Sequence, residues 1–229
     1  MIEGCTRCAR SLRRHWVGAL VVLTTACSEG APPQPVAAEE VSPRSYLVRL
    51  DSDSSDPGLF GLVEDDDGIH IQTGPAGIAY RPEDIVHRGG FHVEATFVQY
   101  DAPIGYREAY GIFVGGLDLE GPDLEYTYLL VRPTGDFLIK RRIGEITETF
   151  VDWTAHAAVA RVIEEGDEPR NTLSIDVVQG ETTFLVNGIA VHSLPTPRVR
   201  PYGVMGIRAN HRLDVRVEDW LLRAVGHDQ

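Results

Sequence analysis

Cysteine is scarce in this 229-residue chain, which contains only Cys5, Cys8 and Cys27. The first two are spaced as Cys-x-x-Cys, but they precede the predicted mature start, so we do not interpret them as a metal or redox motif. If a lipid occupies the thiol of Cys27, the mature part has no free thiol and no disulfide. Its hydrophobic core must then stabilise it alone, which a domain of about 200 residues can do.

The uncharged apolar stretch over residues 16–26 is too short to span a bilayer, which takes about 20 residues. It follows four arginines within residues 7–14, ends in small side chains and is followed at once by Cys27. This arrangement predicts an export signal over residues 1–26. It resembles a bacterial lipoprotein signal, in which such a cysteine is lipidated and becomes the mature N-terminus. The alternative is an ordinary secreted protein with a chance cysteine.

The chain has fewer basic than acidic residues, with 21 Lys and Arg and 34 Asp and Glu, so its net charge is −13. Such a chain repels nucleic acids and anionic lipid surfaces, so we expect no nucleic-acid partner. Membrane attachment would come from the lipid on Cys27. Residues 27–45 are rich in Pro, Ala and Glu and predict a tether, which suggests a protein anchored on the periplasmic or outer face of the bacterial envelope. No protein partner is evident from the sequence.

Helical periodicity is almost absent beyond residue 45, where apolar and polar residues alternate instead. The alternation is clearest over residues 173–177. The pairs Gln179-Gly180 and Asn187-Gly188 then divide the segment 170–194 into three runs, and Asn-Gly favours the tight type I′ turn of a hairpin. This segment therefore predicts a three-stranded antiparallel meander.

Further strands are predicted between turn signals, and no internal repeat of fixed period is visible. About a dozen short strands at such spacing favour a two-sheet antiparallel β-sandwich over residues 46–225, with a barrel as the alternative. These other predicted strands cover residues 46–50, 60–63, 69–73, 91–100, 109–114, 125–131, 137–142, 146–153, 202–208 and 213–222.

Eight short motifs follow one another in a set order: residues 91–95 (FHVEA, a Phe-x-Val-x-Ala strand), 110–116 (YGIFVGG), 128–132 (YLLVR), 151–154 (VDWT), 171–173 (NTL), 184–188 (FLVNG), 202–206 (YGVMG) and 215–220 (VRVEDW). In this order they resemble the concanavalin A-like lectin and glucanase superfamily, whose fold is a jelly roll. Within it the chain is most similar to bacterial exported laminin-G-like and 3-keto-disaccharide-hydrolase-type domains. The resemblance covers residues 88–222, and more loosely from residue 46. It implies the fold and says little about function.

Catalytic motifs are missing. Jelly-roll glucanases carry their carboxylates as Glu-x-Asp-x-x-Glu on one strand, and this chain has no such pattern. Residues 118–125 hold four carboxylates, but within a Gly-Pro loop that favours a solvated acidic turn over acid/base chemistry. There is no Gly-x-Ser-x-Gly, no Gly-Lys-Ser/Thr, no dinucleotide fingerprint and no His-x-x-x-His pair. No catalytic residue is assigned, and the sequence favours a non-enzyme.

Tyr126 and Tyr128 are two residues apart on a predicted strand, so both point to one face. Aromatic rings stack on sugars, and charged groups bind hydroxyls or carboxylates. The alternative is that these tyrosines are ordinary strand formers and that Trp153 is a core or rim anchor. The candidate ligand-binding set is Tyr126, Tyr128, Arg132, Lys140, Arg142, Glu94, Asp152 and Trp153.

Asp51, Asp53 and Asp56 cluster in a turn-rich segment, where their oxygens could hold a structural calcium. A plain acidic turn is the other interpretation, and no other cofactor is expected.

Three functional hypotheses remain open. The first is a non-catalytic carbohydrate-binding domain of an envelope lipoprotein. The second is a glycosidase or a 3-keto-disaccharide hydrolase or lyase. The third is a structural or protein-interaction domain of the envelope.

Overall fold

The structure is a computed structural model that describes residues 45–225, in which almost every element is a strand. The predicted export signal, the lipidation at Cys27 and most of the tether lie outside the described residues. Two short helical turns, η1 (Pro57–Leu59) and α1 (Thr196–Val199), are the helical elements of the described part. Neither is long and apolar enough to cross a membrane.

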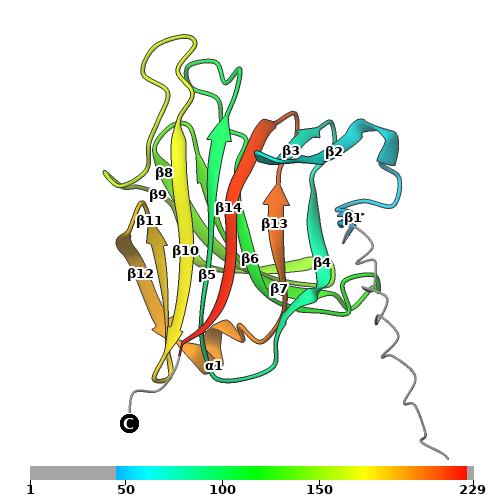
Figure 1. Cartoon of the computed structure of the whole chain (residues 1–229), viewed down its shortest axis with the longest axis vertical. Coiled ribbons are helices and arrows are strands. Elements are labelled where there is room, and N and C mark those ends of the chain that lie inside the picture. The colour runs from blue at the N-terminus through cyan, green and yellow to red at the C-terminus, as the bar shows by residue number, and fades with distance from the viewer. Residues whose placement is uncertain (1–44, 226–229) are drawn as a thin grey trace, which may run out of the picture. The chain divides into compact units, whose positions relative to one another are not determined.

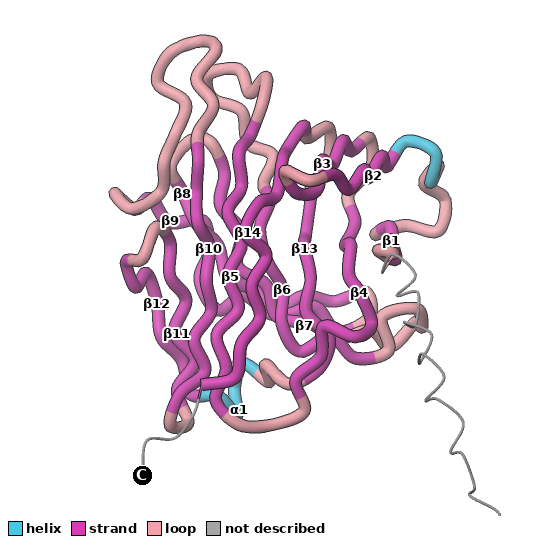
Figure 2. The backbone as a smooth tube through the Cα atoms, in the orientation of Figure 1, coloured by secondary structure: helices cyan, strands magenta, loops and turns pink. Residues whose placement is uncertain are grey.

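The strands form two antiparallel sheets, as predicted (Figure 1), and each sheet has seven strands. Figure 2 traces both sheets, and in one of them, called sheet B below, β10, β5 and β14 lie side by side. Sheet A has the order β1 (Leu47–Leu50), β4 (Gly77–Val86), β13 (Gly203–Ala209), β6 (Tyr110–Leu117), β7 (Glu125–Arg132), β8 (Asp136–Ile143), β9 (Ile146–Ala155). Sheet B has the order β12 (Ile189–Pro195), β11 (Glu181–Val186), β10 (Arg170–Val178), β5 (Gly90–Gln99), β14 (Asp214–Val225), β3 (Gly68–Thr73), β2 (Phe60–Asp65).

The predicted meander is confirmed, because β10, β11 and β12 are neighbours at one edge of sheet B. Asn187 and Gly188 adopt φ values of 51° and 74° in the turn between β11 and β12. Positive φ at both central positions is what a type I′ turn requires, and Asn and Gly tolerate it best.

Strand β4 was not predicted, because Pro82 interrupts its sequence and proline cannot donate to a ladder. The structure places Pro82 at an irregularity: Tyr80 pairs with Gly206 and Ile85 with Val204, so the register shifts between these pairs. On the other side β1 pairs only with the first part of β4, up to Tyr80. The proline therefore interrupts no regular ladder.

The core lies between the two sheets and follows from the alternation in each strand. In β5 the residues Phe91, Val93, Ala95 and Phe97 are fully buried, and Phe97 stacks on Tyr110 of the opposite sheet with ring centroids 5.1 Å apart. Burial of apolar area of this kind is the main stabilising contribution to a fold without disulfides.

The buried Asn171 explains one of the shared sequence motifs. Its side-chain nitrogen donates to the Tyr110 hydroxyl and to the Ala160 carbonyl, and its oxygen accepts from the Ala160 N–H and from the Asn187 side chain. Asn187 in turn donates to the Ala158 carbonyl. These two asparagines therefore hold the loop after β9 against the sandwich, so their role is structural.

Candidate functional site on the outer face of sheet A

Strand β7 presents opposite faces to the core and to the outside of sheet A. Leu129 and Val131 belong to the central core, while Tyr126 and Tyr128 join a second apolar cluster on the other side. Tyr126 is only 1% exposed and Tyr128 only 6%, so neither ring offers an open face for stacking. This outer cluster comprises Ile78, Tyr80, Ala109, Phe113, Leu119, Leu124, Tyr126, Tyr128, Leu130 and Leu138.

The loop between β6 and β7 covers part of this cluster. Its residues Leu119 and Leu124 are 6% and 2% exposed. Arg49 of β1, at the far edge of sheet A, donates from Nη1 to the carbonyl oxygens of residues 119–121, the shortest contact being 2.6 Å to Glu120. The arginine therefore ties the loop to the sheet edge, which keeps the aromatic rings covered.

An ion-pair cluster lies beside the covered rings. The Asp51 carboxylate accepts from Arg142 Nη1 at 2.6 Å and from Arg208 Nη1 and Nη2 at 2.8 and 2.6 Å. Arg208 also donates to the Tyr126 hydroxyl at 3.1 Å, and its Cζ lies 5.4 Å from the Tyr128 ring centroid. Side chains of β8 and β13 thus meet at the carboxylate of Asp51, and we call Asp51, Arg142, Arg208 and Tyr126 the Asp51 cluster.

Burial and charge act in opposite directions in this cluster. Burial alone would raise the pKa of Asp51, but hydrogen bonds and charges from Arg208 and Arg142 hold it below the ordinary value of 3.8. Burial likewise opposes the charged form of Arg208, yet Tyr126 and Asp51 raise the pKa of that guanidinium. Burial raises the pKa of the Tyr128 hydroxyl. Asp51 and Arg208 therefore stay ionised at neutral pH.

A pocket of about 370 Å³ opens at the Asp51 cluster, and we call it the Asp51 pocket. It combines cations, carboxylates, hydroxyls and one apolar wall made by Pro122 and Leu124. Three of the sequence-predicted residues line it, namely Asp51, Asp53 and Arg142. Its lining comprises Arg49, Asp51, Ser52, Asp53, Ser54, Pro122, Leu124, Arg142, Gly144 and Glu145.

The other predicted ligand residues of sheet A lie further along the same face. The Arg132 guanidinium lies 4.3 Å from the Trp153 ring centroid and donates to Asp136 at 2.9 Å. Trp153 is half-buried against the outer cluster, which fits the rim-anchor interpretation. Asp152 is exposed and accepts from the Trp153 backbone N–H.

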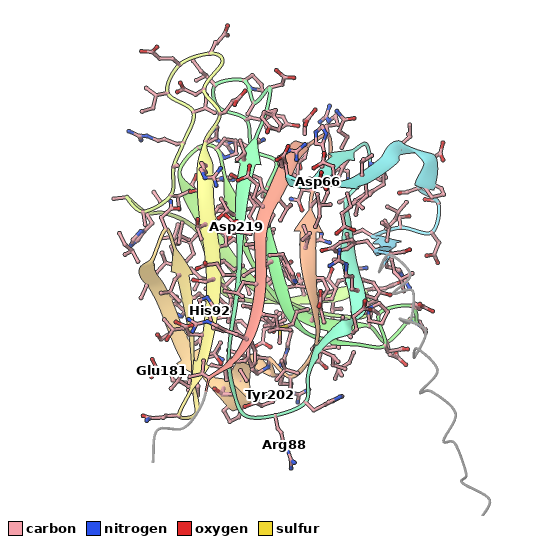
Figure 3. The ribbon with its side chains drawn as sticks, in the orientation of Figure 1. Asp66, Arg88, His92, Glu181, Tyr202 and Asp219 are labelled. Carbon is pink, nitrogen blue, oxygen red and sulfur yellow. The ribbon has the colours of Figure 1, made fainter. Side chains whose placement is uncertain are left out.

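Glu94 does not join this group, because β5 belongs to sheet B. Its carboxylate lies 3.6 Å from Nε2 of His92, whose Nδ1 is 2.5 Å from Asp176. Figure 3 labels His92 on the sheet B side of the molecule. The alternation in β5 was predicted correctly, but it could not tell which sheet the strand joins.

The three aspartates proposed for calcium have separate roles. Asp51 is bound by two arginines, Asp53 has a 97% exposed side chain, and Asp56 accepts from the Gly58 N–H as the N-cap of η1. Within residues 45–225 no three His, Cys, Asp or Glu side chains come together in a way that could hold a metal. Calcium at this turn is therefore not part of the site that we describe.

Arg208 and Arg49 are the site residues that sequence reasoning missed. Arg208 is the only charged residue of β13, and it is 8% exposed. A lone charge inside an otherwise apolar strand is a signal for a buried ion pair, because an unpaired buried charge is too costly. The signal names no partner, and the partner Asp51 is 157 positions away.

No protein-family model matches this chain, and no curated protein matches it. Among solved structures it is similar to the carbohydrate-binding module CBM66 from Bacillus subtilis, with a TM-score of 0.53 and 6% identity over 77% of this chain and 95% of that one. It is also similar to a variant of the family 7 alginate lyase A1-II′ in complex with product (GGG), with a TM-score of 0.50 and 10% identity over 72% and 83%. At these identities the likeness shows the fold alone. The chain is a two-sheet antiparallel sandwich of the concanavalin A-like jelly-roll class.

Proposed function

We propose that this chain is a non-catalytic carbohydrate-binding jelly-roll domain of an exported bacterial lipoprotein, and that the sugar binds in the Asp51 pocket. The observation that carries the proposal is the pocket itself, which brings donors, acceptors and an apolar wall together on the outer face of sheet A. Its volume of about 370 Å³ lies within the range of small-ligand sites, roughly 300–1,000 Å³.

The chemistry of the lining suits sugar hydroxyls. Arg49 and Arg142 supply donors, Asp53 and Glu145 supply acceptors, and charge-assisted hydrogen bonds are the stronger kind. Pro122, which is exposed, offers an apolar surface for the C–H groups of a sugar ring. Because Arg142 is already held by Asp51, little side-chain freedom is lost on binding.

The same ion pairs argue for binding rather than turnover. A general acid must carry a proton near neutral pH, whereas Arg208 and Arg142 hold the pKa of Asp51 below its ordinary value. Both Asp51 oxygens are also occupied by guanidinium donors. In this proposal Asp51 positions the arginines and takes no part in proton transfer.

The comparisons support a sugar as the ligand to test first. CBM66, which shares the fold, is by its name a carbohydrate-binding module. The alginate lyase shares the fold as well, so the tests below include turnover.

A glycan array followed by isothermal titration calorimetry tests the pocket. We expect the double variant Asp53→Asn with Glu145→Gln to weaken binding of the best glycan about tenfold, since two charged acceptors become neutral amide oxygens, whose hydrogen bonds are weaker. The matched control, Asp66→Asn with Glu181→Gln, removes the same charge at exposed positions in the β2–β3 turn and at the start of β11 (Figure 3) and should leave affinity within about twofold. Equal effects of the two double variants would place the site elsewhere.

Two other outcomes count against the proposal. Absence of binding on the array and in calorimetry would remove the carbohydrate hypothesis. Release of shortened or unsaturated products from a bound glycan would establish an enzyme instead.

The export and lipidation parts of the proposal rest on residues 1–27. Fatty-acid labelling of the full chain in a bacterial host should tag the wild type and not Cys27→Ala, and the labelled protein should fractionate with membranes. Labelling that persists in the variant would contradict lipidation at this cysteine.

A further inference from the structure

Lys140 is the only lysine of the chain, and it is placed on the outer face of sheet A. In the ladders it pairs with Tyr128 of β7 on one side and Thr149 of β9 on the other. Its side chain is half-buried. Among the described residues 45–225 the ammonium has no hydrogen-bond or ion-pair partner.

The arginines on the same face of sheet A, unlike Lys140, have carboxylate partners. Arg132 has its own carboxylate, Asp136, at 2.9 Å. Arg142 and Arg208 share the single carboxylate of Asp51. Together with Lys140 this group has three cations and one anion, and the pocket lining adds Arg49, Asp53 and Glu145, which makes four cations and three anions in a chain with a net charge of −13.

The three cations also lie close together. Lys140 and Arg142 are two residues apart on β8, which places them on one face at about 7 Å. The Arg208 Cζ lies 5.4 Å from the ring centroid of Tyr128, the register partner of Lys140. A partly desolvated, unpaired ammonium beside such a pair is stabilised by an anion from outside the fold.

We propose that acidic sugars bind at the Asp51 pocket, and that the ligand's carboxylate or sulfate group reaches past Arg142 to Lys140, which lies on the same face just outside the pocket lining. This inference rests on the proposed carbohydrate-binding function and specifies the chemical class of the ligand. Lys140 supplies the unpaired charge. Arg142 adds a second positive charge on the pocket side, although its three nitrogens already donate to Asp51 and Gly144. The hydroxyls of the ring then bind to the remaining polar lining.

Calorimetry with three probes tests the inference: an oligogalacturonate, its fully methyl-esterified form and a sulfated galactose oligomer of equal length. We expect the acidic probes to bind at least about tenfold more tightly than the ester, with the difference shrinking as salt is raised. The carboxylate and sulfate probes separate the two sources of the anion. Binding of one and not the other identifies which group the site accepts.

Two variants assign the effect to Lys140. Lys140→Gln should weaken binding of the acidic probe about tenfold and change binding of the ester by less than about twofold. Arg223→Gln is the matched control, because it removes one positive charge from an exposed position of sheet B. It should change neither affinity by more than about twofold.

The single lysine permits an independent measurement. Amine acetylation followed by peptide mass mapping reports on Lys140 separately from the N-terminus, and the acidic probe should slow modification of Lys140 while the ester should not. If acid and ester bind equally and Lys140→Gln behaves like Arg223→Gln, the inference is overturned while the proposed function stands. If no probe and no array glycan binds, the proposed function itself fails and the inference falls with it.

Discussion

Replacing Asp51 by Asn removes the only carboxylate of the Asp51 cluster and keeps the shape of the side chain. Arg208, whose side chain is 10% exposed, then keeps one neutral partner, the Tyr126 hydroxyl, and an amide oxygen in place of an anion. Arg142 loses its ion pair as well. The variant therefore leaves a buried guanidinium without a counter-charge.

The magnitude follows from the burial of each partner. Removing one member of a buried ion pair costs about 3–5 kcal/mol. The Asp51 side chain is 32% exposed, so water screens part of the interaction, and the Asn oxygen still accepts. We expect the free energy of unfolding to fall by about 2–3 kcal/mol, which lowers Tm by about 4–12 °C in a domain of this size.

Urea denaturation at pH 7 measures this loss in the free energy of unfolding, with Asp53→Asn as the control. Asp53 receives the same substitution two positions away, but its side chain is 97% exposed and its ion pair with Arg49 is 3.9 Å long. We expect the control to lose less than about 0.5 kcal/mol. Equal losses in the two variants would refute the view that Asp51 stabilises the site.

The pH dependence gives a second check with a definite sign. The pKa of Asp51 is lower in the folded chain than the ordinary 3.8, so its contribution is complete above that value and is lost as pH falls through the folded pKa. The stability difference between wild type and Asp51→Asn should therefore be constant from neutral pH down to about 5 and shrink below about 4. A difference that persists unchanged in acid would mean that the carboxylate charge is not its cause.

Three further substitutions test the packing around the site and the core. Asn171→Ala should cost about 3 kcal/mol, because it leaves the Tyr110 hydroxyl and the Ala160 amide without their buried partner. Tyr126→Phe should cost about 1–2 kcal/mol, since one Arg208 donor loses its acceptor. Gly111→Ala should cost about 3 kcal/mol or more, because an added Cβ would lie 2.0 Å from the Leu129 carbonyl oxygen.

For each of these three substitutions, one result would contradict the predicted loss of stability. Gly61→Ala is the control for the glycine, since its Cβ would meet nothing nearer than 3.8 Å, and a similar loss in both variants would exclude the predicted clash. For Asn171 and Tyr126, chemical denaturation with a loss below about 0.5 kcal/mol would show that water replaces the missing partner.

Local sequence determined most of the strands. Alternation and turn residues suffice for the β10–β12 meander, because each contact in it is between neighbours in the chain and Asn187 and Gly188 accept the turn's backbone angles. Alternation and turn residues did not predict β4, because Pro82 argues against a strand. The irregular pairing of β4 with β13 accommodates this proline. The prediction that Tyr126 and Tyr128 share a face was also local, and it was correct.

Which groups cover that face was decided only by the tertiary structure. The two-residue period of a strand predicts that both tyrosines lie on one face. Whether they are exposed to solvent depends on the β6–β7 loop and on Arg49 at the sheet edge. The site's charge balance is equally non-local, since Asp51 meets Arg142 and Arg208 from 91 and 157 positions away. The energy of an ion pair depends on the distance between its charges in space, whereas the sequence gives only their separation along the chain. These partners could therefore be identified only from the tertiary structure.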